Sequence, residues 1–241
     1  MTIDPSAIIH KSAKIHKDAT IKATAVIGKH VEIGAGTVVD SHAVISGPTK
    51  IGKNNHIYSF ASIGGDPQDI TYEDGQESNL VIGDDNLIRE FCTINRGTEK
   101  ENSLTRIGSN NMLMSYVHIA HDCQLGNHII MSNNASLAGH VHIADWAILG
   151  GFVLVKQFCN VGRHTYAGMG SHINKDVPDY MVATGVQPKI RSINAVGMKR
   201  RGFSASSIAS IKRAFKVVYR ESQGRLLDHA LKELENSESD S

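Results

Sequence analysis

An apolar residue recurs at every sixth position over long stretches of this chain. The longest runs extend from Ile3 to Ile63 and from Ile107 to Ile173, with a short one from Ile82 to Ile94. A period of six fits neither the 3.6 residues per turn of an α-helix nor the period of two of a flat strand. It is typical of a parallel β-helix, in which short strands wind around a triangular prism. We therefore predict an all-β prism over residues 1–176, with three hexads, or 18 residues, in each coil.

Two polar segments interrupt this register, GGDPQDITYEDGQESNLV at 64–81 and NRGTEKENSLTR at 95–106. An insertion inside a stacked solenoid would break the packing of neighbouring coils, so such segments collect on the outside. We expect two external loops, which often carry binding sites, although plain surface loops would have the same composition.

The six-residue pattern stops after Lys175, and residues 177–241 are expected to form a linker and a C-terminal helical domain. The stretch DVPDYMVATGVQPK contains the Pro and Gly residues of a linker. Ser204 is a suitable N-cap for a helix whose apolar stripe recurs at spacings of three and four, at Ile208, Ile211, Phe215 and Val218. A second helix is predicted at 223–236, followed by a frayed tail.

The charge of the chain is nearly balanced, with 25 basic and 24 acidic residues, so nothing global attracts it to nucleic acid or to an anionic membrane. No apolar run approaches the ~18 residues that span a bilayer. Charged residues also break up the N-terminal segment where a signal peptide would have its apolar core. These features favour a cytoplasmic protein without a transmembrane segment.

The three cysteines, Cys92, Cys123 and Cys159, each lie four residues after a hexad position, and strand alternation points that position inward. We predict that they are small buried core residues. A disulfide, a metal site or a nucleophilic thiol is the less favoured alternative. Other apolar residues, such as Met112, Tyr116 and Phe152, point outward in this register and favour a homo-oligomer.

Coil geometry converts sequence spacing into proximity, because residues 18 apart occupy the same place on adjacent coils, ~4.8 Å from one another. Two neighbouring columns result, His121 with Gly139 and Gln157, and Asp122 with His140 and Phe158. His118 precedes His121 by three residues. The sequence therefore predicts a histidine-rich patch beside one carboxylate and one glycine.

A histidine next to an aspartate suits general-base chemistry, because an imidazole titrates near neutrality and a carboxylate can orient it. The N–H of Gly139 has no side chain beside it, as an oxyanion donor requires. One alternative is that these are ordinary turn residues, as several of the 13 histidines can be. Another is a zinc site made by His118, His121 and His140. The placement of Asp122 and Gly139, the long loops and the helical tail favour acyl transfer.

Several stretches, in this order, carry a resemblance to a known family: ASIGGDPQD (61–69), IGDDNLIRE (82–90), INRGT (94–98), HIAHDCQLGN (118–127), NNASLAGHV (133–141), GG (150–151), VKQFCNVG (155–162), DVP (176–178) and MKRRGFS (198–204). In these motifs the chain resembles the acyl-carrier-protein-dependent UDP-N-acetylglucosamine O-acyltransferases of lipid A biosynthesis, a family of hexapeptide-repeat acyltransferases. The resemblance implies a left-handed β-helix, a homotrimer, and active sites between neighbouring subunits. It also implies an acyl donor carried on the phosphopantetheine of acyl carrier protein, with no metal or organic cofactor.

The resemblance further implies residue roles. His121 would remove a proton from the glucosamine 3-hydroxyl, Asp122 would orient His121, and the Gly139 N–H would bind the oxyanion. Substrate-binding positions are matched by Gln68, Asp69, His118, His140, Gln157, Asn194 and Arg201, with Arg200 beside them. Met169 matches a residue that limits the acyl groove, so it would act as an acyl-length ruler that selects a medium-length chain.

Two positions depart from the family pattern: Thr71 stands where the family usually has Lys, and Lys156 where it often has His. These departures leave open the identity of the acceptor. An N-acyltransferase that acts on a 3-amino nucleotide sugar is therefore the first alternative to the O-acyltransferase. A metal-dependent lyase or hydratase of the hexapeptide-repeat class is a less favoured one.

Overall fold

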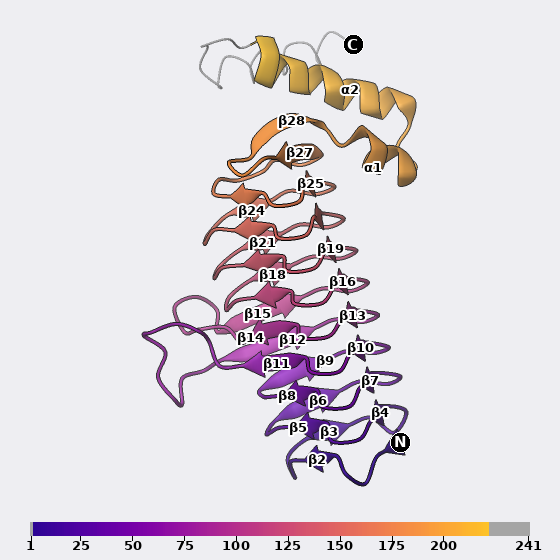
Figure 1. Cartoon of the computed structure of the whole chain (residues 1–241), viewed down its shortest axis with the longest axis vertical. Helices are drawn as coiled ribbons and strands as arrows, with labels where there is room; N and C mark the ends of the chain where they lie inside the picture. The colour runs from indigo at the N-terminus through magenta and orange to yellow at the C-terminus, as the bar shows by residue number, and fades with distance from the viewer. Residues whose placement is uncertain (1, 222–241) are drawn as a thin grey trace.

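The structure is a computed structural model that describes residues 2–221. Its short strands wind into a left-handed parallel β-helix, which confirms the parallel β-helix predicted from the hexads and the left hand that the resemblance implies. Each coil contributes one strand to each of three sheets, and the coils stack along the long axis of the molecule (Figure 1).

The three faces of the prism are sheets A, B and C. Sheet A contains β1 (Thr2–Ile3), β4 (Thr20–Ile21), β7 (Val38–Val39), β10 (His56–Ile57), β13 (Leu87–Ile88), β16 (Met112–Leu113), β19 (Ile130–Met131), β22 (Ile148–Leu149), β25 (Tyr166–Ala167), β27 (Met181–Thr184) and β28 (Lys189–Ile193). Sheet B contains β2 (Ile8–Ile9), β5 (Val26–Ile27), β8 (Val44–Ile45), β11 (Ser62–Gly65), β14 (Thr93–Asn95), β17 (His118–Ile119), β20 (Ser136–Leu137), β23 (Leu154–Val155) and β26 (His172–Ile173). Sheet C contains β3 (Lys14–Ile15), β6 (Val31–Ile33), β9 (Thr49–Ile51), β12 (Asn79–Ile82), β15 (Leu104–Ile107), β18 (Gln124–Leu125), β21 (His142–Ile143) and β24 (Asn160–Val161).

The core of the prism is built from the hexad residues. In β17, for example, Ile119 is fully buried, and it pairs in register with Ile94 and Leu137 of the adjacent coils. The cysteine prediction is also confirmed: all three cysteines are free and buried. Burial raises the pKa of Cys92 and of Cys123 to about 12, so these thiols stay protonated and unreactive at neutral pH.

The chain turns the corners of the prism through residues with positive φ, a conformation that His, Asn and Asp tolerate better than most residues. His42 (φ 63°) and His128 (φ 57°) are corner residues of this kind. These two histidines are therefore ordinary turn residues, as the sequence allowed for several of the histidines. His140 (φ 62°) also turns a corner, but its side chain is buried and lies beside Asp122.

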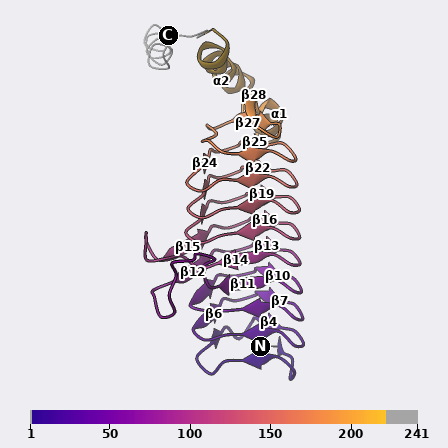
Figure 2. The ribbon, with the colours of Figure 1, turned by 60° about the vertical axis from the view of Figure 1, so that its left-hand side comes forward.

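Both predicted loops are present, in slightly shorter form, at residues 66–78 between β11 and β12 and at 96–103 between β14 and β15. They leave the same edge of the prism, between sheets B and C, in two consecutive coils. They project from one side of the prism in both views (Figures 1 and 2). We call this edge, which contains loops 66–78 and 96–103 and the corners at 120–123, 138–141 and 156–159, the B/C edge.

The segment expected to be a linker is instead partly extended strand. β27 continues sheet A in parallel with β25, and β28 returns antiparallel to it. The hexad pattern could not reveal these two strands, because they do not follow its spacing. Helix α1 (Ala195–Arg200) then leads to α2 (Ala205–Lys216) and to a π-helical turn at Val217–Glu221.

Helix α2 confirms the first predicted helix. Ser204 is its N-cap and accepts a hydrogen bond from the Ser207 N–H at 3.0 Å. Its predicted apolar stripe packs on the core through Ile208, Ile211 and Phe215. The second predicted helix, at 223–236, and the tail lie outside the described residues. Among residues 2–221, no helix combines the length and the hydropathy needed to cross a membrane.

Candidate active site

The predicted catalytic residues lie on successive corners of the B/C edge. His121 and Asp122 connect β17 to β18, and Gly139 and His140 connect β20 to β21 one coil further on. The His140 N–H donates to the His121 carbonyl at 3.1 Å, as expected for residues on adjacent coils. The two columns predicted from the 18-residue spacing are therefore confirmed.

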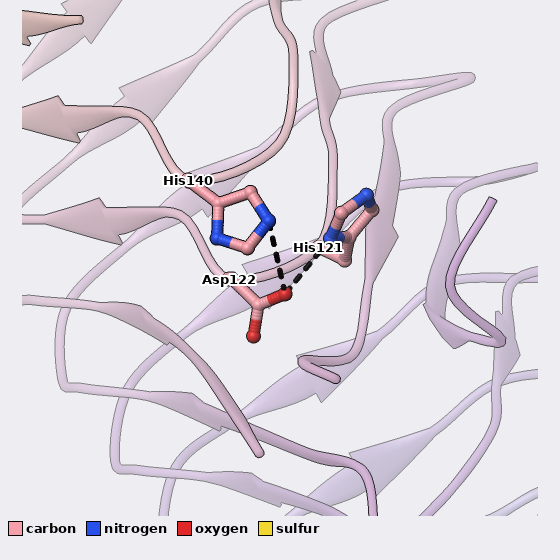
Figure 3. A group of neighbouring side chains, drawn as sticks. All are labelled: His121, Asp122 and His140. Atoms are coloured by element: carbon pink, nitrogen blue, oxygen red, sulfur yellow. Dashed lines mark hydrogen bonds and ion pairs between the residues drawn. The ribbon is translucent and has the colours of Figure 1, made fainter. Parts of the chain in front are cut away.

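His121 and Asp122 form a buried hydrogen-bonded pair. Nδ1 of His121 lies 2.8 Å from Oδ2 of Asp122 (Figure 3), and the residues are 5% and 0% exposed. The Thr98 N–H and hydroxyl donate to the same carboxylate at 2.8 and 2.7 Å. Burial opposes the ionisation of Asp122, but the hydrogen bonds from His121 and Thr98 outweigh it and hold the pKa of this carboxyl below its ordinary value.

An ionised carboxylate can only accept, so Nδ1 of His121 must carry the hydrogen that it shares with Asp122. This tautomer leaves Nε2 with a free lone pair. His121 is therefore set up to take a proton through Nε2, as a general base does.

Gly139 lies directly against the imidazole of His121. A Cβ atom at position 139 would lie 2.6 Å from Cε1 and 2.8 Å from Nε2 of that ring, so any side chain there would displace it. Among the residues that the structure describes, the Gly139 N–H meets no acceptor. A residue with a free backbone donor thus packs against the imidazole of the base, which suits the binding of an oxyanion near a general base.

His140 completes the cluster in Figure 3. Its Nε2 lies 3.8 Å from Oδ2 of Asp122, and its ring meets His121 edge-on and stacks on Phe158 at a centroid distance of 4.6 Å. Its Nδ1 lies 3.1 Å from Oε1 of Glu101, which is within ion-pair range but outside hydrogen-bond geometry. This buried nitrogen has no other partner within residues 2–221.

His118 lies in the same patch, with its Nδ1 2.7 Å from the Thr93 hydroxyl. Burial, with a smaller contribution from His121, lowers the pKa of His118 and favours its neutral form. Gln157, from the next corner of the edge, is exposed. These positions agree with the placement predicted for the patch.

Loop 66–78 brings Asp69 to the same edge, next to a basic residue of the other loop. Lys100 Nζ lies 2.5 Å from Oδ2 of Asp69, and the Thr71 N–H and hydroxyl both donate to Oδ1 at 2.9 Å. The hydrogen bond from Lys100, with smaller contributions from Thr71, holds the pKa of the Asp69 carboxyl well below its ordinary value. Lys100, from loop 96–103, thus provides a cation beside Asp69, where Thr71 of loop 66–78 provides none. Gln68, next to Asp69, is exposed.

A metal ion is the competing use of this cluster. His121, Asp122 and His140 each offer one ligand atom, and these atoms all lie within 4.8 Å of one another. This set includes Asp122 in place of the predicted His118. However, Asp122 already accepts hydrogen bonds from His121 and Thr98, so the observed arrangement is that of a hydrogen-bonded base rather than of an open coordination site.

The structure does not bring the remaining predicted residues to this edge within one chain. Asn194 caps α1 and donates to the His164 carbonyl at 2.8 Å, and Arg201 Nη1 lies 3.2 Å from Nδ1 of the same histidine. His164 lies at the edge between sheets C and A. Arg200 is exposed in this region, and Met169, which is 78% exposed, lies at the edge between sheets A and B.

Sequence comparison decides the family. The chain is 50% identical to an acyl-[acyl-carrier-protein]–UDP-N-acetylglucosamine O-acyltransferase of Saccharophagus degradans, over 96% of this chain and 89% of the relative. It is 49% identical to the protein of the same name from Stutzerimonas stutzeri, over 98% and 90% of the two chains. The chain belongs to the UDP-N-acetylglucosamine O-acyltransferase family.

Solved structures of UDP-N-acetylglucosamine acyltransferases agree. The Francisella novicida protein has a TM-score of 0.95 and 45% identity, with 100% of this chain and 87% of that chain covered. The Acinetobacter baumannii protein has a TM-score of 0.94 and 44% identity, with 98% and 90% covered. Family models match residues 6–41, as bacterial transferase hexapeptide repeats, and 176–241, as domain 2 of UDP-N-acetylglucosamine O-acyltransferase.

Sequence reasoning missed three residues of loop 96–103: Thr98, Lys100 and Glu101 contact Asp122, Asp69 and His140 respectively. Thr98 lay within the INRGT stretch that carries the resemblance, but its partner is 24 positions away. The 18-residue rule relates only residues that follow the hexads. Contacts made by an inserted loop fall outside it.

Proposed function

We propose that this chain transfers an acyl group from acyl carrier protein to the 3-hydroxyl of UDP-N-acetylglucosamine, the first step of lipid A biosynthesis. Its relatives at about 50% identity are named acyl-[acyl-carrier-protein]–UDP-N-acetylglucosamine O-acyltransferases. The observation that carries the proposal is the position of His121, with Asp122 on its Nδ1 and Gly139, whose N–H is free, packed against its ring.

The reaction follows from these atoms. Nε2 of His121 takes the proton of the sugar hydroxyl as the hydroxyl oxygen forms a bond to the thioester carbonyl carbon. Asp122 stabilises the imidazolium that results, and the Gly139 N–H binds the carbonyl oxygen as it becomes negative. When the C–S bond breaks, the imidazolium returns its proton to the departing phosphopantetheine thiolate. No metal and no organic cofactor takes part in this scheme.

The distribution of the predicted residues over three edges supports a homotrimer with sites between subunits. Within one chain, His121, His164 and Met169 lie on three different edges, so a single chain cannot gather them around one substrate. Exposed apolar residues on the edge between sheets A and B also suit a subunit contact, because Phe60, Phe91 and Tyr116 form a continuous stack there.

In such a trimer, each substrate group has a chemically suitable partner. Asp69, Gln68, His118, His140 and Gln157 are polar groups for the sugar near the base. Asn194, Arg200 and Arg201 of the neighbouring subunit suit the nucleotide, since a guanidinium recognises a diphosphate well. The exposed Met169 would close the acyl groove and select a medium-length chain.

The remaining elements of the proposal concern partners and location. The acyl donor is bound to an acidic carrier protein, which the exposed basic residues of the enzyme would attract. The proposed compartment is the cytoplasm. Nucleic acid is not expected as a partner, since the charge of the chain is nearly balanced.

The direct test incubates the purified protein with UDP-N-acetylglucosamine and a ladder of acyl carrier proteins with acyl chains of increasing length. The wild type should form an acylated nucleotide sugar with release of the free carrier thiol. His121→Ala should lose about 10²–10⁴ in rate, the usual contribution of a general base. Activity of this variant within about tenfold of wild type would overturn the assignment.

A second candidate, amide formation on a 3-amino nucleotide sugar, is favoured by one observation. Loop 66–78 carries Thr71 where the family usually has Lys, and the carboxylate of Asp69 in this loop is paired instead with Lys100. The 3-amino analogue of the acceptor should therefore be assayed beside the natural hydroxyl sugar. Mild base cleaves an ester product and spares an amide, so the product bond distinguishes the two reactions.

A further inference from the structure

Loop 96–103 contacts three separate residues of the candidate site. Thr98 donates twice to Asp122, Lys100 pairs with Asp69 of the other loop, and Glu101 lies 3.1 Å from Nδ1 of His140. Lys100 and Glu101 are adjacent in sequence. One short segment therefore contacts both Asp69, in the preceding coil, and His140, two coils later in the prism.

The base of this loop is fixed rigidly. The Arg96 side chain is buried, donates to the Gly64 carbonyl at 2.6 Å and to the Ser78 hydroxyl at 3.2 Å, and pairs with Asp66. Since Gly64, Asp66 and Ser78 flank or belong to loop 66–78, Arg96 ties the two loops together. Lys100 and Glu101 are therefore presented from a fixed base rather than from a free loop tip.

The pairing of Lys100 with Asp69 involves a carboxylate that is mostly out of water. The Asp69 side chain is only 13% exposed, whereas Lys100 is 52% exposed. Thr71 occupies Oδ1 of Asp69 and Lys100 occupies Oδ2, so each oxygen already has a fixed donor. Removal of Lys100 would leave this carboxylate without a cation and free to change its rotamer.

Glu101 lies beside a buried nitrogen of His140 that has no hydrogen-bond partner among the described residues. His140 is 7% exposed, and its Nδ1 has no hydrogen-bond partner in the part of the chain that the structure describes. The Glu101 carboxylate is the acidic group next to that nitrogen, and Asp122 lies on the other side of the ring. A small rotation of the exposed Glu101 side chain would complete a hydrogen bond and fix the orientation of the imidazole.

We propose that Lys100 and Glu101 are positioning residues that set the affinity of the enzyme for the acceptor sugar, Lys100 through the carboxylate of Asp69 and Glu101 through the imidazole of His140. This inference rests on the proposed function. It extends that function by assigning to loop 96–103 the alignment of two acceptor-binding residues, Asp69 and His140. The competing explanation is that the two contacts only hold the loop in place and contribute little to binding of the sugar.

The experiment compares Lys100→Met and Glu101→Ala with the conservative variants Lys100→Arg and Glu101→Asp. Lys17→Met, at an exposed lysine near the start of the prism, is the control for loss of a surface charge. The measurements are KM for UDP-N-acetylglucosamine, kcat at saturating acyl carrier protein, calorimetric binding of the nucleotide sugar, and the thermal midpoint.

Lys100→Met and Glu101→Ala should each raise the acceptor KM and the calorimetric Kd about tenfold, with kcat within about threefold of wild type and an unchanged thermal midpoint. The conservative variants should recover most of the affinity. Values equal to those of Lys17→Met would overturn the inference, as would a loss of kcat together with a lower thermal midpoint. A wild type that binds the sugar but forms no product would count against the proposed function, while its binding data would still decide the role of the loop.

Discussion

The contact between Gly139 and His121 predicts that a single methyl group at position 139 will inactivate the enzyme without unfolding it. In Gly139→Ala, the new Cβ would lie 2.6 Å from Cε1 of the imidazole. Carbon atoms in contact prefer about 3.5–4.0 Å, so the ring or the backbone must move by about 1 Å. Gly139 is not among the glycines with positive φ, so the backbone itself accepts alanine.

The imidazole is the group that should move, because the backbone of position 139 is held by the adjacent coils. A shift of about 1 Å stretches the 2.8 Å hydrogen bond to Asp122 beyond its useful range and moves Nε2 from its observed position. Misplacement of a reacting group by this amount costs about 10²-fold in rate. Overpacking of the site should cost about 1–3 kcal/mol of stability, which a stacked solenoid can absorb.

The assay is kcat for acyl transfer together with the thermal midpoint, and the matched control is Gly151→Ala. A Cβ atom at position 151 would approach only the Asn133 carbonyl oxygen, at 3.3 Å, so this variant adds the same methyl group away from the base. Gly151→Ala should retain activity. If Gly139→Ala also stays within about tenfold of wild type, the geometry of base and donor described above is wrong.

A double variant separates the ring from the backbone donor. In His121→Ala there is no imidazole for the methyl group to meet, so Gly139→Ala should then cost little further stability or rate. Independent, additive losses in the two single variants would show that the methyl group acts elsewhere.

Three further predictions follow from the same structure. Met169→Gly should shift the preference among acyl donors toward longer chains, measured by competition between donors, and an unchanged preference would remove Met169 from the groove. The pKa of Asp69 and of Asp122 lies below the ordinary ~3.9 of an aspartate, so their contribution to stability is present above that pH and is lost as the pH falls through the folded-state values. Thr98→Ala, which removes the hydroxyl hydrogen bond to Asp122 and keeps the backbone one, should therefore flatten the acid dependence of the thermal midpoint, and an unaltered dependence would contradict this. Treatment with a strong chelator followed by metal analysis should leave acyl transfer unchanged, whereas a stoichiometric metal whose removal abolishes activity would support the lyase or hydratase alternative.

The sequence alone predicted the prism and the two columns that contain His121 and Asp122. Each hexad side chain points inward and each coil has 18 residues, so the residues that stack on adjacent coils follow from the spacing. The proximity of His121 to Gly139 follows from that length and from nothing else. The strands β27 and β28 were not predicted, since their apolar residues do not follow the period of six. The partners of Lys100 and Thr98 could not be predicted either, because they lie 31 and 24 positions away, across inserted loops whose paths no repeat describes.

Both loops leave the B/C edge in the two coils that directly precede the coil of His121, and this has a consequence for how the protein can change over evolution. The distance along the prism between these loops and His121 can vary only in whole coils, in steps of ~4.8 Å. Loss of one complete 18-residue coil before β10 would shorten the prism and leave these contacts intact. Insertion of one coil between β14 and β17 would preserve the fold but would place Thr98 and Glu101 out of reach of Asp122 and His140.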